Sequence, residues 1–139
     1  MQQTLAIIKP DAVSRLHIGE ILHRIEDEGF KIVALKMVSL TKSQAEGFYA
    51  VHSERAFFNS LTDFMSSGPV VVIALEGEDV INGWRRLMGE TDPAKAALGT
   101  LRREYGAAIE NNATHGSDAP ETAAFELNYF FTTLELSAK

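Results

Sequence analysis

The sequence predicts an alternation of strands and helices in the order β-α-β-α-β-α-β-α, with additional short helices. Apolar segments at 4–10, 31–40 and 68–77 indicate strands, and apolar residues at helical spacing lie between them. This order fits the split β-α-β-β-α-β motif, an α+β ferredoxin-like sandwich with an antiparallel sheet and helices on one face, and equally a parallel Rossmann sheet. Against the parallel sheet, the chain contains neither G-x-G-x-x-G nor G-x-x-x-x-G-K-[ST], so it lacks a glycine-rich phosphate cradle.

Length and composition predict a single domain over residues 1–139. With 139 residues and 45% hydrophobic content, the chain fits one core. The first apolar run meets Lys9 and Pro10 too early for a signal peptide or a membrane span, so we expect no membrane association. The lack of cysteine fits a reducing cytoplasm. A net charge of −6 argues against broad nucleic-acid binding, so no specific nucleic-acid partner is expected.

In the first half of the chain, the elements follow from apolar periodicity and its interruptions. The isoleucine-rich run 4–10 stops at Pro10 and indicates a buried strand. A helix with Gly29 as its C-cap follows, and its apolar stripe is Ile18, Ile21, Leu22 and Ile25. Alternation predicts a second strand over 31–40, and Ser43 with Glu46 forms a capping-box pattern that opens a helix through His52.

The second half contains the strongest strand signal. Residues 68–77 are nearly continuous in β-branched side chains, so both faces of this strand should be covered. A helical stripe then ends at Gly89 and consists of Val80, Ile81, Trp84, Leu87 and Met88. Residues 89–100 lack periodicity and predict a long ordered loop. A short helix near 101–106, a short strand near 112–115 and a long helix that starts around Pro120, between Asp118 and Glu121, complete the order.

His115 stands among small polar residues at 111–118. A neutral imidazole, with an ordinary pKa of roughly 6.5, offers a nucleophilic nitrogen near pH 7. Gly116 permits close approach of a bulky group, and Ser117 with Asp118 begins a helix whose free N–H groups favour anions. On these residues alone, a phosphate-accepting histidine and an ordinary loop histidine are equally good interpretations. A Ser-His-Asp hydrolase triad is disfavoured because its members are nearly contiguous and the nucleophile elbow is missing.

Cationic residues flank the irregular loop. Lys9 ends the first strand, Arg85 and Arg86 lie on the helix before the loop, Thr91 lies in it, and Arg102 follows it. Arginine makes bidentate, permanently charged contacts with phosphate oxygens, so such a cluster can replace the missing glycine cradle. Taken singly, each arginine is more often a solvated surface residue.

Aromatic and acidic residues add weaker signals. Tyr49 and His52 share a helical face with apolar neighbours, so core packing is the default expectation for both. One member of the pair Phe57 and Phe58 should point outward, where it can stack on a base. Glu126 either holds the second ring nitrogen of a histidine or is solvated.

Six motifs together closely resemble the nucleoside diphosphate kinase family. They are KPDAV at 9–13, GFYAVHSERAFF at 47–58, SGPVVVIALEG at 67–77, LMGETDP at 87–93, GTLR at 99–102 and NATHGSD at 112–118. They cover most of the chain in the family's order, and the family's N-x-x-H-G-S-D motif places its catalytic histidine at His115. The resemblance implies the antiparallel β-α-β-β-α-β sandwich, which decides between the two topologies left open above.

The resemblance also implies a ping-pong reaction between nucleoside tri- and diphosphates. His115 would take the γ-phosphate as phosphohistidine and pass it to a nucleoside diphosphate. Glu126 and Ser117 would orient or stabilise the imidazole, with Tyr49 close to it. Mg²⁺ would arrive bound to the nucleotide phosphates, without a protein cage of carboxylates.

For the nucleotide, the resemblance implies contacts along its whole length. Lys9 and Asn112 would contact the ribose 3′-hydroxyl and the sugar-side phosphate region. The remaining phosphate ligands would be Arg85, Thr91 and Arg102. Phe57 and Leu61 would sandwich the base without reading its edges, which implies broad base tolerance.

Three positions depart from the family pattern. Ala119 follows the motif's aspartate where serine is usual, Leu98 replaces a proline, and Phe125 replaces a generally basic residue. None is the nucleophile or a phosphate ligand, so activity is expected. Family members usually form homo-oligomers, and self-association is expected here too. An alternative of another class is a binding or regulatory module that keeps the pocket, but the complete set of site residues favours the enzyme.

Overall fold

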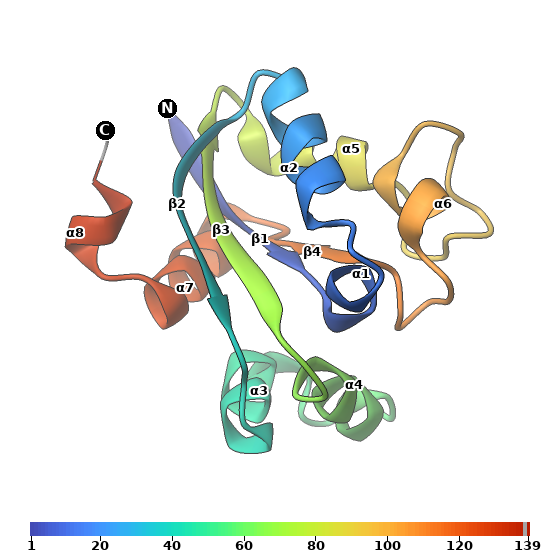
Figure 1. Cartoon of the computed structure of the whole chain (residues 1–139). Helices are drawn as coiled ribbons and strands as arrows, with labels where there is room; N and C mark the ends of the chain where they lie inside the picture. The colour runs from blue at the N-terminus through green and yellow to red at the C-terminus, as the bar shows by residue number, and fades with distance from the viewer. Residues whose placement is uncertain (138) are drawn as a thin grey trace.

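The computed structural model describes residues 1–137 and 139 and contains a four-stranded sheet in the order β2-β3-β1-β4 (Figure 1). The strands are β1 (Gln2–Ile8), β2 (Lys31–Val38), β3 (Val70–Gly77) and β4 (Thr114–Gly116). Strand β1 pairs antiparallel with β3 and β4, and β2 pairs antiparallel with β3. The predicted antiparallel α+β sheet is therefore confirmed, and the parallel Rossmann sheet is excluded.

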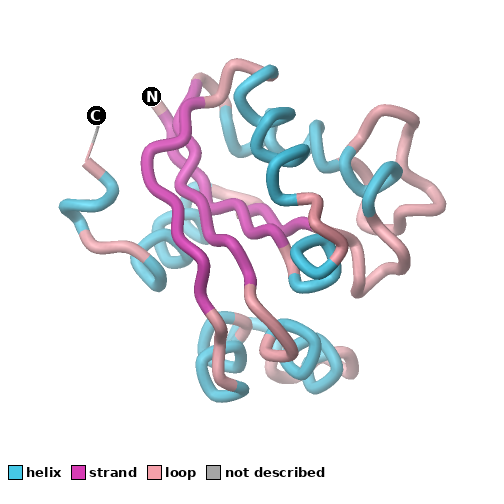
Figure 2. The backbone as a smooth tube through the Cα atoms, in the orientation of Figure 1, coloured by secondary structure: helices cyan, strands magenta, loops and turns pink. Residues whose placement is uncertain are grey.

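Helices fill the connections between these strands. In chain order they are α1 (Pro10–Ser14), α2 (Ile18–Asp27), α3 (Lys42–Phe48), the 3₁₀ turn η1 (Ala50–His52), α4 (Phe58–Met65), α5 (Val80–Met88), α6 (Leu101–Tyr105), α7 (Pro120–Phe130) and α8 (Thr133–Leu136). Residues 89–100 contain no helix or strand, as the loop prediction requires. Figure 2 shows the strands running through the middle of the molecule with helices around them.

Helices cover both faces of the sheet. Along β1, Leu5 and Ile7 pack into one cluster with residues of α3, α4 and α7. Ala6 and Ile8 face the opposite way, into a second cluster with residues of α2, α5 and α6. Since successive side chains of a strand alternate between faces, a strand buried on both must be apolar throughout. The continuous apolar run of β3 predicts this double burial, whereas the two-layer motif alone predicts helices on one face.

Three helices lie where the sequence pattern predicts none. They are α1, α4 and α8. Helix α4 has no side-chain cap and contains several residues of low helix propensity, among them Asn59, Ser60 and Thr62. Its amphipathic face packs Leu61 and Met65 into the core, so tertiary packing stabilises it. Helix propensity alone does not predict such a helix.

Helix caps also differ from the prediction. The capping box of α3 consists of Thr41 and Gln44, and not of Ser43 and Glu46, and the α-helix ends at Phe48 before the 3₁₀ turn. The Thr41 hydroxyl accepts from the Gln44 N–H at 3.1 Å, and the Gln44 side chain accepts from the Thr41 N–H at 2.9 Å. This reciprocal pair is two residues earlier than predicted because Thr41, in an extended conformation, is the residue that precedes the first helical turn.

Candidate active site

His115 occupies the middle of β4, an edge strand that pairs with β1. Its Nε2 lies 2.9 Å from Oε1 of Glu126 on α7. The Ser117 hydroxyl donates to the same carboxylate oxygen at 2.8 Å. With both side chains only 16% and 14% exposed, this contact fixes the orientation of the imidazole ring. In the described part of the chain, Nδ1 has no hydrogen-bond partner.

Two aromatic rings of the α3 region hold the imidazole on its other side. Phe48 meets the His115 ring edge-on at 5.4 Å between centroids, and Tyr49 does so at 5.9 Å. The Tyr49 hydroxyl is buried without a hydrogen-bond partner among the described residues. Burial, reinforced by the nearby Glu126 carboxylate, raises the pKa of Tyr49, so this phenol stays protonated and is available as a donor.

Lys9 and Asn112 form a buried polar pair beside His115. The Lys9 ammonium donates to Oδ1 of Asn112 at 2.8 Å. Burial lowers the pKa of Lys9 from 10.5 to about 8, and the positive charge of Arg102 adds to this effect. The Asn112 amide donates in turn to the carbonyl of Thr91 at 3.0 Å, so this pair connects β1 to the irregular loop.

The segment between Asn112 and β4 is backbone-strained. Ala113 has φ of +74°, which L-residues with a side chain rarely adopt. Its N–H donates to Oδ2 of Asp11 at 3.1 Å, and its carbonyl accepts from the Lys9 N–H at 2.8 Å. These two contacts hold the turn that brings Asn112 and His115 to the same side of β1.

Arg102 lies between the irregular loop and β4. Its two terminal nitrogens donate to the carbonyls of Gly89 and Thr114, each at 3.0 Å. Its Nε is buried and has no partner among the described residues. Burial and the neighbouring Arg85 lower the pKa of Arg102 to about 10. A crowded, incompletely satisfied guanidinium of this kind is a natural site for an anion.

One cavity of about 950 Å³ brings most of the predicted residues together. Of the predicted site residues, its lining includes His115, Lys9, Asn112, Thr91, Arg102, Phe57 and Leu61. Arg85 lines an adjoining hollow of about 430 Å³ together with Thr91 and Arg102. Tyr49, Ser117 and Glu126 lie outside the cavity lining, against the imidazole.

Six further residues line the cavity although the sequence pattern did not predict them there: His52, Asp92, Ala108, Ile109, Glu110 and Asn111. His52 lines the cavity and lies 5.7 Å from the Phe57 ring, so the expectation of core packing is wrong for His52 and right for the buried Tyr49. Helix α3 stops before His52, and the 3₁₀ turn redirects its side chain. Ile109 and Glu110 also line the cavity and had no signal, since they lie in an aperiodic segment.

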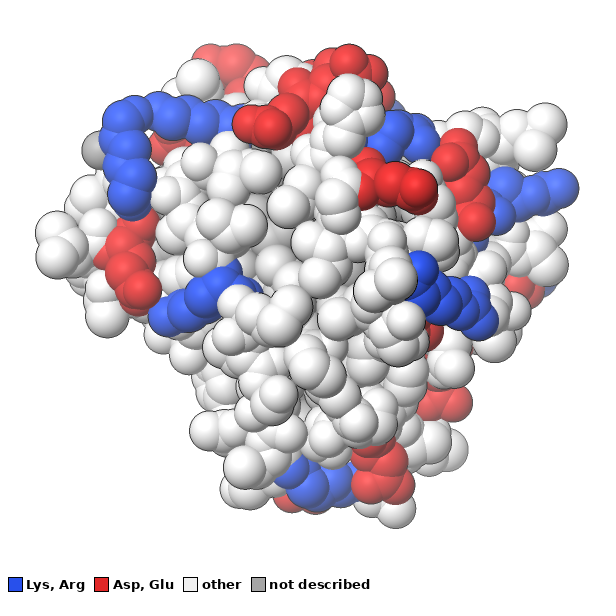
Figure 3. Space-filling view, in the orientation of Figure 1, with Lys and Arg blue, Asp and Glu red and all other residues white. Residues whose placement is uncertain are grey.

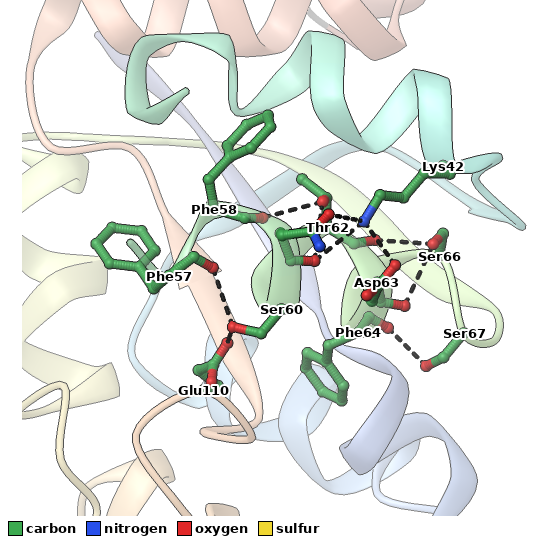
Figure 4. Close-up of polar contacts among 11 residues, drawn as sticks. Lys42, Phe57, Phe58, Ser60, Thr62, Asp63, Phe64, Ser66, Ser67 and Glu110 are labelled. Atoms are coloured by element: carbon green, nitrogen blue, oxygen red, sulfur yellow. Dashed lines mark hydrogen bonds and ion pairs between the residues drawn. The ribbon is translucent and has the colours of Figure 1, made fainter. Parts of the chain in front are cut away.

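Figure 4 shows how α4, which contributes Leu61 to the cavity lining, is held against α3. Lys42 of α3 donates to the carbonyl and side chain of Asn59 at 3.0 and 2.9 Å and pairs with Asp63 at 2.5 Å, which cross-links the two helices. Ser60 donates to Glu110 at 2.7 Å and so connects α4 with the facing segment. Phe57 is 42% exposed while Phe58 packs on the core, so Phe57 is the outward member of the pair.

The surface shows a mixed charge distribution. On the face of Figure 3, acidic and basic side chains are interspersed around the rim, and the middle of that face is largely uncharged. Within the described residues, no helix has both the length and the apolar character needed to cross a bilayer.

Comparisons with known proteins agree with this geometry. The family model described as nucleoside diphosphate kinase matches residues 2–136. A nucleoside diphosphate kinase of Desulfovibrio desulfuricans is 65% identical over 137 residues, which are 99% of this chain and 99% of the relative. One from Desulfosudis oleivorans is 59% identical over 139 residues and the full length of both chains.

Solved structures give the same answer. The Aquifex aeolicus nucleoside diphosphate kinase superposes with a TM-score of 0.96 at 46% identity, covering 98% of this chain and 99% of the other. A halophilic nucleoside diphosphate kinase from Halobacterium salinarum, in complex with CDP, superposes with a TM-score of 0.95 at 38% identity, covering 99% of this chain and 92% of the other. The fold, the matched span and the full-length relatives lead to one conclusion: this chain belongs to the nucleoside diphosphate kinase family, phosphotransferases that move phosphoryl groups between nucleotides.

Proposed function

We propose that the protein transfers the γ-phosphate of a nucleoside triphosphate to a nucleoside diphosphate by a ping-pong mechanism through phosphohistidine at His115. The observation that carries this proposal is that the two nitrogens of the His115 ring differ: Nε2 contacts Glu126, and Nδ1 has no hydrogen-bond partner among the described residues. Nε2 is engaged by Glu126 at 2.9 Å, so the ring proton resides there and the lone pair is on Nδ1. Nδ1 is therefore the nucleophile of the proposed reaction.

In the first half-reaction, the Nδ1 lone pair attacks the γ-phosphorus of the triphosphate. The P–N bond forms as the bond from the γ-phosphorus to the β–γ bridging oxygen breaks, and the nucleoside diphosphate leaves with that electron pair. In the second half, a terminal β-phosphate oxygen of the acceptor attacks the phosphorus and the P–N electrons return to Nδ1. Glu126 stabilises the positive charge that the ring acquires when Nδ1 is phosphorylated, and Ser117 holds the carboxylate in place.

Cationic side chains of the cavity and the adjoining hollow bind the phosphates of the nucleotide. Lys9, Arg85 and Arg102 neutralise charge on the transferred group and on the leaving diphosphate, and the Thr91 hydroxyl supplies a neutral donor. The protonated Tyr49 hydroxyl, unpartnered and beside the imidazole, is a further donor for the group on His115. Lys9 and Asn112 also bind the ribose 3′-hydroxyl.

The base is bound by apolar contact. Phe57 and Leu61 contribute one wall and Ile109 lies on the cavity lining with them. Stacking and apolar contact do not distinguish one base from another, since every base presents a π-face. The Halobacterium salinarum relative was solved with CDP, and we propose ligands of the same class here, with broad base tolerance.

Mg²⁺ is the proposed cofactor, carried by the nucleotide. Within the described residues, no group of three or more His, Cys, Asp or Glu side chains is arranged to hold a metal, and the polar lining is dominated by cations and neutral groups. This donor set fits phosphate oxygens and not a bare cation, so the nucleotide would supply most of the ligands of Mg²⁺. When bound, Mg²⁺ supplies charge neutralisation and holds the phosphates in one geometry.

We also propose that the chain self-associates and works in the cytoplasm. Leu35 and Met37 on the edge strand β2 are 49% and 57% exposed, which supports an interface with a second copy. The absence of cysteine supports the compartment.

Mass spectrometry of the intact protein tests the mechanism. Brief exposure to ATP and Mg²⁺ without acceptor should add one phosphoryl group, which acid removes and added GDP discharges. A His115→Ala variant should remain unmodified. If nucleotide binds but no adduct forms, the protein is a binding module and the catalytic proposal is wrong.

A further inference from the structure

The strand that carries His115 is short and lies at one edge of the sheet. Strand β4 has three residues and pairs with β1, and within the described residues no strand pairs with its other side. A three-residue ladder alone fixes a backbone weakly. Since a misplacement of about 1 Å can cost a reaction roughly a hundredfold in rate, the acceptor strand requires additional support.

Trp84 of α5 provides such a support from the face opposite the imidazole. Its indole N–H donates to the backbone carbonyl of His115 at 3.1 Å. The side chain is fully buried, with 0% exposure. Trp84 therefore contacts the backbone of His115, while Phe48, Tyr49 and Glu126 contact its ring.

Gly116 makes this approach possible. A Cβ at residue 116 would lie 2.6 Å from Cδ1 of Trp84 and 2.6 Å from Cε of Met88. Only a residue without a side chain lets α5 pack this closely against β4. Gly116 therefore has a second role besides access for a phosphoryl group: it leaves the space in which the Trp84 indole packs against β4.

Helix α5 then joins two parts of the site. Trp84 is followed by Arg85, a proposed phosphate ligand on the same helix. A hydrogen bond from Trp84 to His115 sets the distance between the backbone that carries this arginine and the backbone that carries the nucleophile. The phosphoryl donor and acceptor are thereby aligned through one rigid element.

We infer that Trp84 is a positioning residue, whose indole N–H holds the backbone of His115 in line with the phosphates. This inference rests on the proposed role of His115 as phosphoryl acceptor. Trp84 touches no reacting atom and acts through the main chain of the nucleophile. Its loss should therefore slow phosphorylation without weakening nucleotide binding.

The test replaces Trp84 with β-(3-benzothienyl)alanine, which keeps the bicyclic shape and substitutes sulfur for the N–H. The rate constant for His115 phosphorylation by ATP should fall about threefold to tenfold, the range expected for one hydrogen bond. The dissociation constant for ADP should change less than about twofold, because no nucleotide contact is lost. Ile81→Val is the matched control: it alters a buried apolar side chain of the same helix that lines neither hollow of the site, and it should leave the phosphorylation rate unchanged.

A second measurement needs no substitution. Trp84 is the single tryptophan of the chain, so a ¹⁵N-labelled sample gives one indole N–H resonance. That resonance should shift when His115 is phosphorylated and return when GDP discharges the protein. This readout remains decisive even if the benzothienyl variant fails to fold.

The outcomes separate the inference from its premise. Equal phosphorylation rates in the variant and the unsubstituted protein, or an indole resonance that does not respond, would show that Trp84 merely fills the core. A loss of ADP affinity that matches the loss of rate would also overturn the positioning role. If the unsubstituted protein accepts no phosphoryl group on His115, the proposed function fails, and the inference fails with it.

Discussion

At the scale of single residues, the imidazole of His115 depends on a carboxylate that another side chain holds. Glu126 receives both Nε2 of His115 and the Ser117 hydroxyl on one oxygen. The Ser117 hydroxyl also accepts from the Leu5 N–H at 3.3 Å, so the chain of contacts ends on β1. The histidine is thus oriented by the sheet itself.

Glu126→Gln should lower the rate of His115 phosphorylation by about 10- to 100-fold, because a neutral amide stabilises the charged phosphohistidine ring less than a carboxylate does. Binding of ADP should be nearly unchanged. Single-turnover quench experiments with ATP measure the rate. Ser117→Ala is the comparison, with a smaller loss because the carboxylate stays in place; a Glu126→Gln rate equal to that of the unsubstituted protein contradicts the role of this charge.

Lys9 makes stability depend on pH. Its pKa is lowered from 10.5 to about 8 on folding, so between these values the unfolded chain binds more protons and the free energy of unfolding rises with pH. Below pH 8 the buried charge costs roughly 3 kcal/mol, a cost that disappears toward pH 10.5. Lys9→Met should therefore show its largest gain over the unsubstituted protein near pH 7. Urea titrations across pH 7 to 10.5 check this, and a constant difference contradicts it.

Lys9 should also set an alkaline limit on activity. Because the proposed role of Lys9 at the phosphates requires a charged ammonium, kcat/KM should fall above pH 8, with an apparent pKa of about 8 in the free enzyme. Lys9→Arg keeps the charge, so the fall in kcat/KM should move to higher pH, toward the pKa of about 10 of Arg102. Steady-state rates over pH 6 to 10.5 distinguish the cases. If kcat/KM of the arginine variant falls at the same pH as that of the unsubstituted protein, the alkaline decrease belongs to another titrating group.

At the scale of elements, the start of α7 matters because this helix carries Glu126. Thr122 accepts from the Ala119 N–H at 3.0 Å and donates to Oδ1 of Asp118 at 2.7 Å. This hydroxyl caps the helix from inside its first turn, although residue 119 itself has no side-chain oxygen to offer. The departure at Ala119 is thus compensated locally.

Thr122→Val should lower the free energy of unfolding by about 1 kcal/mol, the usual cost of losing a cap. Valine has nearly the same shape, so core packing is retained. Chemical denaturation measures the change. A loss below about 0.3 kcal/mol would show that solvent replaces the hydroxyl without cost.

The elements also show what sequence reasoning reaches. Periodicity locates α2, α5, α7 and the three long strands, because each buries a continuous stripe or run. The motifs locate His115, Lys9 and Arg102. Periodicity misses α4, which depends on tertiary packing, and it misses the positive φ of Ala113, since alanine gives no signal of that conformation. The hydrogen bond from Trp84 to His115 could not be predicted either. The apolar stripe predicts that Trp84 is buried, but only the folded structure shows that its indole N–H meets the carbonyl of His115.

At the scale of the whole molecule, the uncharged middle of the face in Figure 3 and the two exposed apolar side chains of the edge strand β2 favour a second copy. Replacing Leu35 and Met37 together with glutamate should reduce the assembly to smaller species, because charges on an edge strand oppose pairing. Sedimentation velocity gives the masses. Val51→Glu, at a residue 82% exposed and outside β2, is the control and should leave the mass unchanged. A monomeric unsubstituted protein would contradict self-association.

The strand order β2-β3-β1-β4 places the proposed catalytic strand and the proposed interface strand at opposite edges of the sheet. His115, the proposed nucleophile, lies on the β4 edge, and the exposed apolar side chains lie on the β2 edge. Two copies joined along β2 would place their β4 strands seven strand spacings apart, about 34 Å. That separation exceeds the Debye length of roughly 10 Å at moderate salt several times over. The charge of a phosphoryl group loaded in one copy would then have little direct effect on the other copy, so such a pair should show no cooperativity of electrostatic origin.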